Sequence, residues 1–238
     1  MQHLFEKLKK FWQLRLAPRG FPGLYLAVTF FVLVAASWLF GVIAEDVATR
    51  DRIIIIDARF SAWLHAHAIE RLTRLMLLVT ALHSMLSVTV VTLAVSAYLW
   101  IRRLRFWVIH LLLAVFGGML LNFLLKIAFR RPRPLFDDPT VTLTTFSFPS
   151  GHTMMATVFY GVLCALVIAR GHRWEWRAAA VLGSALMISL VGFSRIYLGA
   201  HFLSDVLAAI AEGLAWLGCC FFAVEVIRRR QSGNHKFL

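Results

Sequence analysis

The sequence predicts an all-α, polytopic membrane protein with six transmembrane helices, and two observations support this fold class. Hydrophobic residues make up 60% of the 238 residues and charged residues only 16%, whereas soluble domains average roughly 45–50% and 25%. The hydrophobic residues are also gathered into six runs of about 17–26 residues, each long enough to cross a bilayer as a helix. No run alternates polar and apolar residues over ten positions, as the strands of a membrane barrel would.

Charge and cysteine content exclude other classes of protein. The formal net charge is +13, from 25 Lys and Arg against 12 Asp and Glu. A nucleic-acid-binding protein can be equally basic, but it would not contain so many apolar runs of membrane length, so no nucleic-acid partner is expected. The three cysteines, Cys164, Cys219 and Cys220, all lie within apolar runs. They predict no disulfide framework.

The first apolar run, residues 21–44, is too long for the core of a signal peptide, and we predict that it is retained as a span. The other five predicted spans are residues 75–100, 106–129, 153–169, 178–197 and 202–227. No internal repeat or low-complexity tract divides the chain. Residues 1–238 are therefore predicted to form a single membrane-embedded domain.

The positive charges predict the orientation of these spans. With the N-terminus inside, the cytoplasmic segments hold 15 of the 25 Lys and Arg residues; these segments are 1–20, 101–105, 170–177 and 228–238. The positive-inside rule then predicts that both termini are cytoplasmic. Residues 4–16 have an amphipathic pattern, so 1–20 is predicted to be a cytoplasmic interfacial segment, and residues 58–74 are a similar candidate on the outer face. The alternative is that both segments are only charged flanks.

Three polar clusters, in residues 126–134, 149–152 and 194–205, are predicted to meet at the outer, extracytoplasmic face. Only the predicted topology brings them together. Taken singly, each has an ordinary structural explanation as a flank, a turn or a helix start. The clusters are Lys126 with Arg133-Pro134, then Pro149-Ser150-Gly151-His152, and last Ser194-Arg195 with His201 and Asp205.

The cations and the helix start in these clusters favour phosphate binding. Lys126, Arg133 and Arg195 can only donate hydrogen bonds, and the two guanidinium groups match phosphate oxygens bidentately. Ser150 and Gly151 begin a predicted helix, whose free N–H groups and dipole also favour an anion. Together they predict an anion-binding site.

The histidines of the clusters indicate phosphoryl transfer. His201 and Asp205 are four residues apart and share a helix face. Asp205 can therefore orient the imidazole and stabilise its cationic form, which makes His201 a candidate nucleophile. His152 is the candidate general acid. Spacing alone does not decide which histidine attacks, and His201 is favoured because a carboxylate lies one turn away. Such a site needs no metal and no cofactor.

The three clusters resemble the signature of the type 2 phosphatidic acid phosphatase family, which comprises membrane lipid phosphate phosphatases related to vanadium haloperoxidases. The match runs from Lys126 to Asp205 with every marked position filled. The resemblance implies the same residue roles, and a bacterial cytoplasmic (inner) membrane enzyme whose site faces the periplasm or the cell exterior. It implies a lipid phosphate substrate in the bilayer, with undecaprenyl diphosphate ranked slightly ahead of phosphatidylglycerol phosphate, phosphatidate and lipid A phosphates.

Two alternatives use the same residues. In a lipid phosphotransferase, a lipid acceptor would replace water in the second step. A non-enzymatic protein that binds or transports anionic lipids would need only the anion site, and the complete set of His201, Asp205 and His152 argues against it. No obligate protein partner is evident from the sequence.

Further polar residues lie near the predicted site. Glu212 is seven residues beyond Asp205 and about 10 Å deeper in the membrane. It is expected either to belong to a structural network of polar residues or to form the floor of the substrate cavity. Asn122 and His83 are its candidate partners. Arg130 and Arg131 either extend the head-group pocket or merely flank the span.

The long connection from 130 to 152 is a candidate binding loop or lid. Its phenylalanines could meet a lipid chain or seal the site, and its two acids are expected to be solvated loop residues. These residues are Phe136, Phe146 and Phe148, and Asp137 and Asp138.

Overall fold

The computed structural model describes residues 22–50, 53–136, 140–141, 145–171 and 173–234, with side chains from 26 to 227. Within these ranges all regular structure is helical. The helices are α2 (Pro22–Thr49), α3 (Ile53–Ala66), α4 (Glu70–Leu82), α5 (Met85–Ile101), α6 (Arg105–Leu112), the π-helical η1 (Leu113–Gly117), α7 (Gly118–Phe129), α8 (Gly151–Arg170), α9 (Trp174–Tyr197) and α10 (Leu203–Asn234). The predicted interfacial segment at 4–16, Asp137 and Asp138 lie outside the described residues.

The predicted spans correspond to helices of membrane length. Five are long and apolar enough to cross a bilayer, and α4 with α5 makes a sixth if this bent pair counts as one span. The expectation of one continuous helix over 75–100 was wrong, because α4 and α5 meet at an angle of 49°. Ser84 explains the break: its hydroxyl accepts a hydrogen bond from the N–H of Ser87 and caps a new helix.

The third span also departs from a regular α-helix. Residues Leu113–Gly117 form a π-helical turn between α6 and α7. The indole Nε1 of Trp216 donates to the carbonyls of Leu113 and Ala114, at 3.3 and 3.1 Å. Gly117 allows this approach, because a Cβ atom there would lie 2.4 Å from the Trp216 ring. Trp216 therefore satisfies carbonyl groups that the widened turn exposes.

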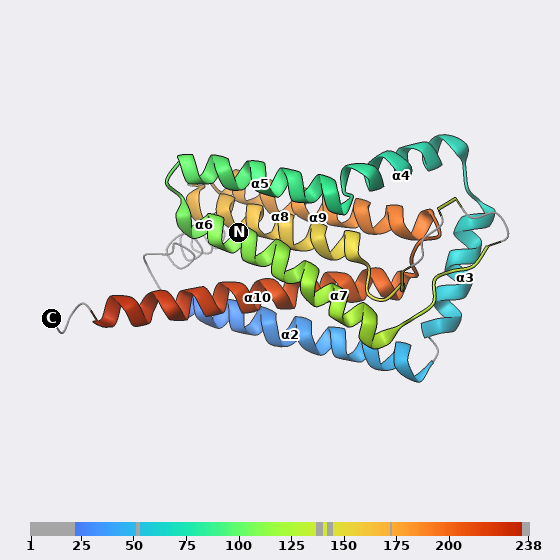
Figure 1. Ribbon diagram of the computed structural model, residues 1–238, viewed down its shortest axis with the longest axis horizontal. Coiled ribbons are helices and arrows are strands. Elements are labelled where there is room, and N and C mark those ends of the chain that lie inside the picture. Colours follow the sequence, from blue (N-terminus) through green and yellow to red (C-terminus); the bar gives the residue numbers. More distant parts are fainter. Residues whose placement is uncertain (1–21, 51–52, 137–139, 142–144, 172, 235–238) are drawn as a thin grey trace, which may run out of the picture.

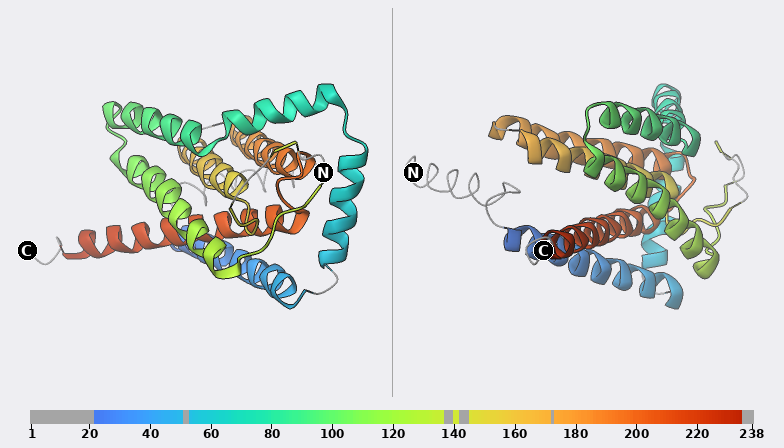
Figure 2. Two further views of the ribbon diagram at one scale, coloured as in Figure 1. Left: turned by 45° about the vertical axis from the view of Figure 1, so that its right-hand side comes forward. Right: turned by 60° about the vertical axis from the view of Figure 1, so that its left-hand side comes forward.

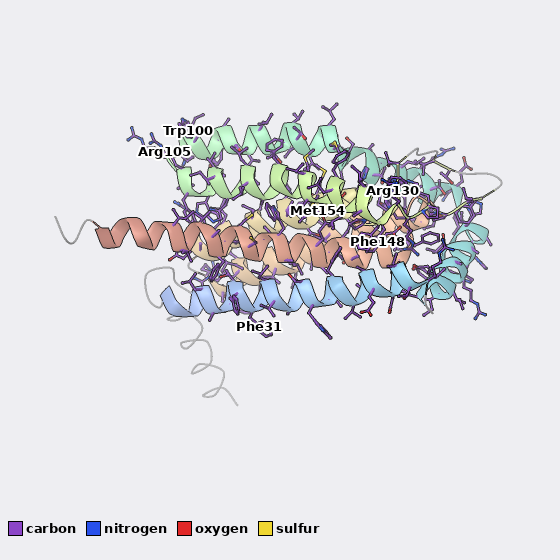
Figure 3. All side chains as sticks on the ribbon, turned by 60° about the horizontal axis from the view of Figure 1, so that its bottom comes forward. Phe31, Trp100, Arg105, Arg130, Phe148 and Met154 are labelled. Carbon is purple, nitrogen blue, oxygen red and sulfur yellow. The ribbon has the colours of Figure 1, made fainter. Side chains whose placement is uncertain are left out.

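Helix α8 lies inside the bundle and contacts α5, α6, α7, α9 and α10 (Figure 1). All seven residues from 153 to 159 are buried, so this helix is covered on every side. Helix α2 packs mainly on α10 and is peripheral. Its Phe31 and Trp38 are each 71% exposed, and Figure 3 shows Phe31 pointing outward while Met154 of α8 lies within the bundle. The exposed apolar face of α2 suits contact with lipid.

Helix α3 crosses one end of the bundle, roughly perpendicular to the long helices (Figures 1 and 2). Leu64 is buried against residues of α9 and α10, whereas Trp63 is 57% exposed. The predicted interfacial segment at 58–74 is thus two helices, α3 and the start of α4, and α3 also covers the bundle. The end of α7, the start of α8, the end of α9 and the start of α10 all lie under this cover (Figure 1).

Candidate active site

The structure brings the three polar clusters together at the end of the bundle that α3 covers. Helix α7 places Lys126 there, and the segment after it places Arg133. The start of α8 contributes Ser150, Gly151 and His152. The end of α9 and the following turn contribute Arg195 and His201, and the first turn of α10 contributes Asp205.

His201 is the most enclosed histidine of this group, with only 2% of its surface exposed. Its Nε2 lies 3.2 Å from a terminal nitrogen of Arg133, and its Nδ1 lies 3.4 Å from Oδ2 of Asp205. A guanidinium can only donate, so Nε2 must carry the lone pair and the ring proton must be on Nδ1. The nitrogen with the lone pair therefore faces Arg133, and the protonated nitrogen faces the carboxylate.

Burial lowers the pKa of His201 well below its ordinary value of 6.5, because desolvation disfavours the charged ring. The charges of Arg195, Lys126, Arg133 and His152 lower it further. The ring is consequently neutral at physiological pH, which is the state that can attack phosphorus.

Arg133 connects the turn before α10 to the segment that precedes α8. Its Nε donates to the carbonyl of Thr145 at 2.6 Å, and its terminal nitrogens donate to the carbonyls of Ala200 at 2.6 Å and Phe146 at 3.2 Å. Burial lowers the pKa of Arg133, and Asp205 partly offsets this. The guanidinium stays within reach of the His201 ring while it holds two backbone segments.

Lys126 and Arg195 complete the positive charge of the site. The Lys126 ammonium donates to the carbonyls of Phe146 at 2.8 Å and Ser147 at 3.2 Å. Arg195 is 2% exposed and donates to the hydroxyl of Thr80 at 2.9 Å, while its buried Nε has no hydrogen-bond partner. An unpartnered buried donor is costly. Arg195 thus has a buried donor without a partner in a site where an anion is expected.

The start of α8 supplies backbone donors close to these cations. Ser150 occupies the N-cap position, but its hydroxyl pairs with the hydroxyl of Thr153 at 3.0 Å and does not cap the helix. Its N–H donates to the carbonyl of Asp205 at 3.0 Å, which links α8 to α10. Gly151 leaves little room for a side chain, since a Cβ atom would lie 3.2 Å from Oδ1 of Asn122. His152 follows, half-buried, in the first helical turn.

Arg131 is a residue whose place the sequence did not reveal. The sequence predicted either a head-group pocket or a flank for it, but Arg131 is 7% exposed and its guanidinium is bound by three buried side chains. One terminal nitrogen donates to Asp205 at 2.6 Å and to Ser204 at 2.7 Å, and the other donates to Asp57 at 2.8 Å. The exposed Arg130, in contrast, ends α7 in the left-handed conformation and donates to the carbonyl of Ile127.

Glu212 and Asn122 form a buried pair beneath the site. The Asn122 amide donates to Oε2 of Glu212 at 2.9 Å, while Oε1 is buried without a hydrogen-bond partner. His83 does not join them, contrary to expectation. Its Nε2 lies 2.7 Å from the hydroxyl of Tyr160, so the polar network splits into two pairs.

The phenylalanines after α7 occupy different environments. Phe148 is fully buried against Phe40 and Phe129 and is not exposed to lipid, so of the two expected roles only sealing the site stays a prediction. Phe136 stacks on His65 of α3, with ring centroids 4.1 Å apart, and Phe146 is 39% exposed. Among the described residues, no group of three or more His, Cys, Asp and Glu could hold a metal ion.

Relatives of known structure share this arrangement of helices. The chain superimposes on the crystal structure of a transmembrane PAP2 type phosphatidylglycerolphosphate phosphatase from Bacillus subtilis with a TM-score of 0.73. The sequence identity is 26%, and the match covers 84% of this chain and 97% of that one.

Sequence comparison identifies the same group of proteins. Phosphatidylglycerophosphatase B of Bacillus subtilis is 40% identical over 106 residues, which are 44% of this chain and 52% of that protein. Dolichyldiphosphatase 1 of Homo sapiens is 31% identical over 124 residues, or 47% and 52%. The chain spans about half the length of these curated relatives. A family model described as the PAP2 superfamily matches residues 107–229, more than half of the chain and all three clusters, and the chain belongs to this family.

Proposed function

We propose that the protein is a metal-independent lipid phosphate or diphosphate hydrolase that works through a phosphohistidine on His201. The observation that carries this proposal is the position of the neutral His201 ring. Its free nitrogen faces Arg133, and its protonated nitrogen faces Asp205. The charges of Lys126 and Arg195 also act on the ring. A nucleophile, its orienting carboxylate and an anion-binding set therefore meet at one point.

In the first step, Nε2 of His201 attacks the phosphorus atom of the substrate. The new N–P bond forms as the bond from phosphorus to the leaving oxygen breaks, and His152 gives its proton to that oxygen. Asp205 stabilises the positive charge that develops on the His201 ring. Lys126, Arg133 and Arg195 bind the non-bridging oxygens, with help from the N–H groups of the first turn of α8.

In the second step, water replaces the lipid. His152, now deprotonated, takes a proton from the water molecule as its oxygen attacks phosphorus. The N–P bond breaks, and the electron pair returns to Nε2 of His201. Inorganic phosphate then leaves and both histidines recover their first state, so no metal or cofactor is required.

The proposed site opens on the extracytoplasmic face of a bacterial cytoplasmic membrane. The distribution of Lys and Arg supports this side, because it predicts cytoplasmic termini and thus outward clusters. The clusters lie at the end of the bundle opposite the turns that join α5 to α6 and α8 to α9 (Figure 1). These turns carry the basic residues Arg102, Arg103 and Arg173.

For the substrate, we favour phosphatidylglycerol phosphate, with undecaprenyl diphosphate second. The names of the Bacillus subtilis relatives support phosphatidylglycerol phosphate. Dolichyl diphosphate, named in the human relative, is a polyprenyl diphosphate and supports the second. An apolar cavity of about 560 Å³ lined by α2, α8, α9 and α10 suits a hydrocarbon chain. It reaches Thr157, six residues and about 9 Å along α8 from Gly151.

The test is phosphate release by the purified protein from phosphatidylglycerol phosphate, undecaprenyl diphosphate, phosphatidate and lipid A. The assay contains a chelator and no added Mg²⁺. We expect release from at least one lipid, loss of activity by roughly 10⁴-fold or more in His201→Ala, and full activity in the control His67→Ala, which changes an exposed histidine. Equal activity in His201→Ala, or activity only with a divalent ion, would contradict the proposal. Label transferred from donor to a lipid acceptor would identify a phosphotransferase.

A further inference from the structure

The guanidinium of Arg131 lies between two buried carboxylates that come from distant parts of the chain. Asp205 on α10 accepts from one terminal nitrogen at 2.6 Å, and Asp57 on α3 accepts from the other at 2.8 Å. The face of the guanidinium rests on the ring of Phe202, 4.4 Å from its centroid. Hydrogen bonds at both edges and a ring against its face hold this cation in one orientation.

Asp57 is 1% exposed, and its hydrogen bonds are to Ser204 and Arg131. Its Oδ1 accepts from the N–H of Ser204 at 3.0 Å, and its Oδ2 accepts from the hydroxyl of Ser204 and from Arg131. Burying a second carboxylate beside one cation is expensive. Asp57 also satisfies an N–H in the first turn of α10 and pairs with a buried cation, so its structural contribution has to be separated from any effect on the candidate site.

The geometry of Asp205 shows what this arrangement achieves. Its Oδ1 is held by Arg131, and its Oδ2 accepts from the N–H of Phe202 at 2.9 Å. In this orientation Oδ2 also faces Nδ1 of His201, at 3.4 Å. Without Arg131, the carboxylate could turn toward the cations that await phosphate. It would then neutralise them and move away from Nδ1 of His201, which is buried 3.4 Å from Oδ2 and has no hydrogen-bond partner of its own.

We propose that Arg131 and Asp57 are positioning residues that hold Asp205 against His201 and away from the phosphate-binding cations. This role rests on the proposed function of the site. Asp57 acts through Arg131, and Arg131 acts through Asp205. Helix α3, which crosses the end of the bundle beside the start of α10 (Figure 2), thereby contributes to the chemistry without touching the substrate.

The test compares Arg131→Met with Arg130→Met, two substitutions that remove the same charge from neighbouring positions. Arg130 is exposed and contacts only a carbonyl of its own helix. We expect Arg131→Met to lower kcat by about 10- to 100-fold, with KM changed by less than about three-fold, since phosphate-binding groups remain. Arg130→Met should keep kcat within about two-fold. Asp57→Asn should give a smaller loss, again in kcat.

Activity is referred to the folded fraction, measured by thermal unfolding. A drop that merely follows loss of folded protein, or an equal drop in Arg130→Met, would overturn the proposal. A rise in KM at constant kcat would do the same, because it would place Arg131 in substrate binding. If Arg131→Met does not fold, the same comparison of kcat and KM is made with Asp57→Asn.

A spectroscopic measurement separates this proposal from the proposed function. In ¹⁵N-histidine spectra of the ligand-free protein, His201 should be the Nδ1-protonated tautomer, and Arg131→Met should shift it toward a mixture of tautomers. An unchanged tautomer in Arg131→Met would overturn the positioning role. If the wild-type protein hydrolyses no lipid phosphate, the proposed function fails, while the tautomer still reports whether Arg131 acts on His201.

Discussion

At the scale of single residues, the proposed mechanism requires His201 to be neutral. Its pKa is lowered by burial and by the surrounding cations, whereas in the unfolded chain it is near 6.5. As the pH falls through 6.5, the unfolded chain therefore takes up a proton before the folded protein does. This group lowers the free energy of unfolding from about pH 6.5 downward, and its contribution is constant above that value.

The prediction is that folded His201 stays neutral well below pH 6.5. In NMR titrations of histidine-labelled protein, its ring resonances should not move between pH 8 and 6.5. The acid limb of kcat/KM, corrected for ionisation of the substrate phosphate, should also lie below 6.5. A titration of His201 centred at or above 6.5 would contradict the burial argument. Spectra of His201→Ala identify the resonance.

Spacing and residue chemistry were enough to propose the residues that would touch phosphate, because Lys126, Arg133 and Arg195 leave few other uses for such a set of donors. They were not enough for Arg131 and Asp57. Arg130 and Arg131 are adjacent and chemically identical, and only the left-handed turn at Arg130 directs one guanidinium outward and the other inward. Asp57 follows four isoleucines, but Ile55 and Ile56 are more than half exposed, so this apolar run does not distinguish a buried acid from an exposed one.

Among the structural elements, the turn between α9 and α10 positions His201 and depends on Gly199. Gly199 has φ of +67°, and a Cβ atom there would lie 2.7 Å from the ring of Phe136. We expect Gly199→Ala to lower the free energy of unfolding by about 1–2 kcal/mol from the backbone alone. Activity should fall as well, because displacement of Phe136 disturbs its stack on His65. Thermal unfolding in detergent and phosphate release measure the two effects.

Gly199→Asn is the matched comparison, since asparagine tolerates a positive φ better than alanine does. It should still meet Phe136 but should be less strained. Phe136→Ala combined with Gly199→Ala removes the contact and leaves only the backbone cost. Wild-type stability in Gly199→Ala would show that the turn relaxes without penalty.

Hydropathy located the helices to within a few residues, because a membrane-spanning helix must be long and apolar. It did not reveal the break at His83–Ser84 or the π-helical turn in the third span. Both depend on specific hydrogen bonds, from the N–H of Ser87 to the hydroxyl of Ser84 and from the indole of Trp216 to the carbonyl of Leu113. A sum of side-chain hydrophobicity over twenty residues does not register them.

For the whole molecule, the charge distribution predicts which end of the bundle faces out. Ala68, in the turn from α3 to α4, and Arg173, in the turn from α8 to α9, are both exposed and lie at opposite ends of the bundle (Figure 1). We expect Ala68→Cys to react with a membrane-impermeant maleimide in intact cells, and Arg173→Cys to react only after lysis. The background lacks Cys164, Cys219 and Cys220.

The two positions serve as controls for each other. Labelling of Arg173→Cys alone in intact cells would show that the orientation is the reverse of the predicted one. The candidate site would then face the cytoplasm. Labelling of both positions would show leaky cells, and lysed cells show that each cysteine is reactive. Phosphate release by each variant confirms that it is folded.

For the whole site, two of the cations already have protein partners. Lys126 and Arg133 donate to backbone carbonyls of residues 145–147, so this stretch of chain is an internal competitor of the phosphate. Each hydrogen bond that the substrate gains is one that the chain gives up, and the net gain on binding is smaller than the list of contacts suggests. Under the proposed mechanism, the same exchange would favour turnover, because the returning carbonyls would compete with inorganic phosphate for the cations. The expected consequence is weaker binding of the substrate together with faster release of the product.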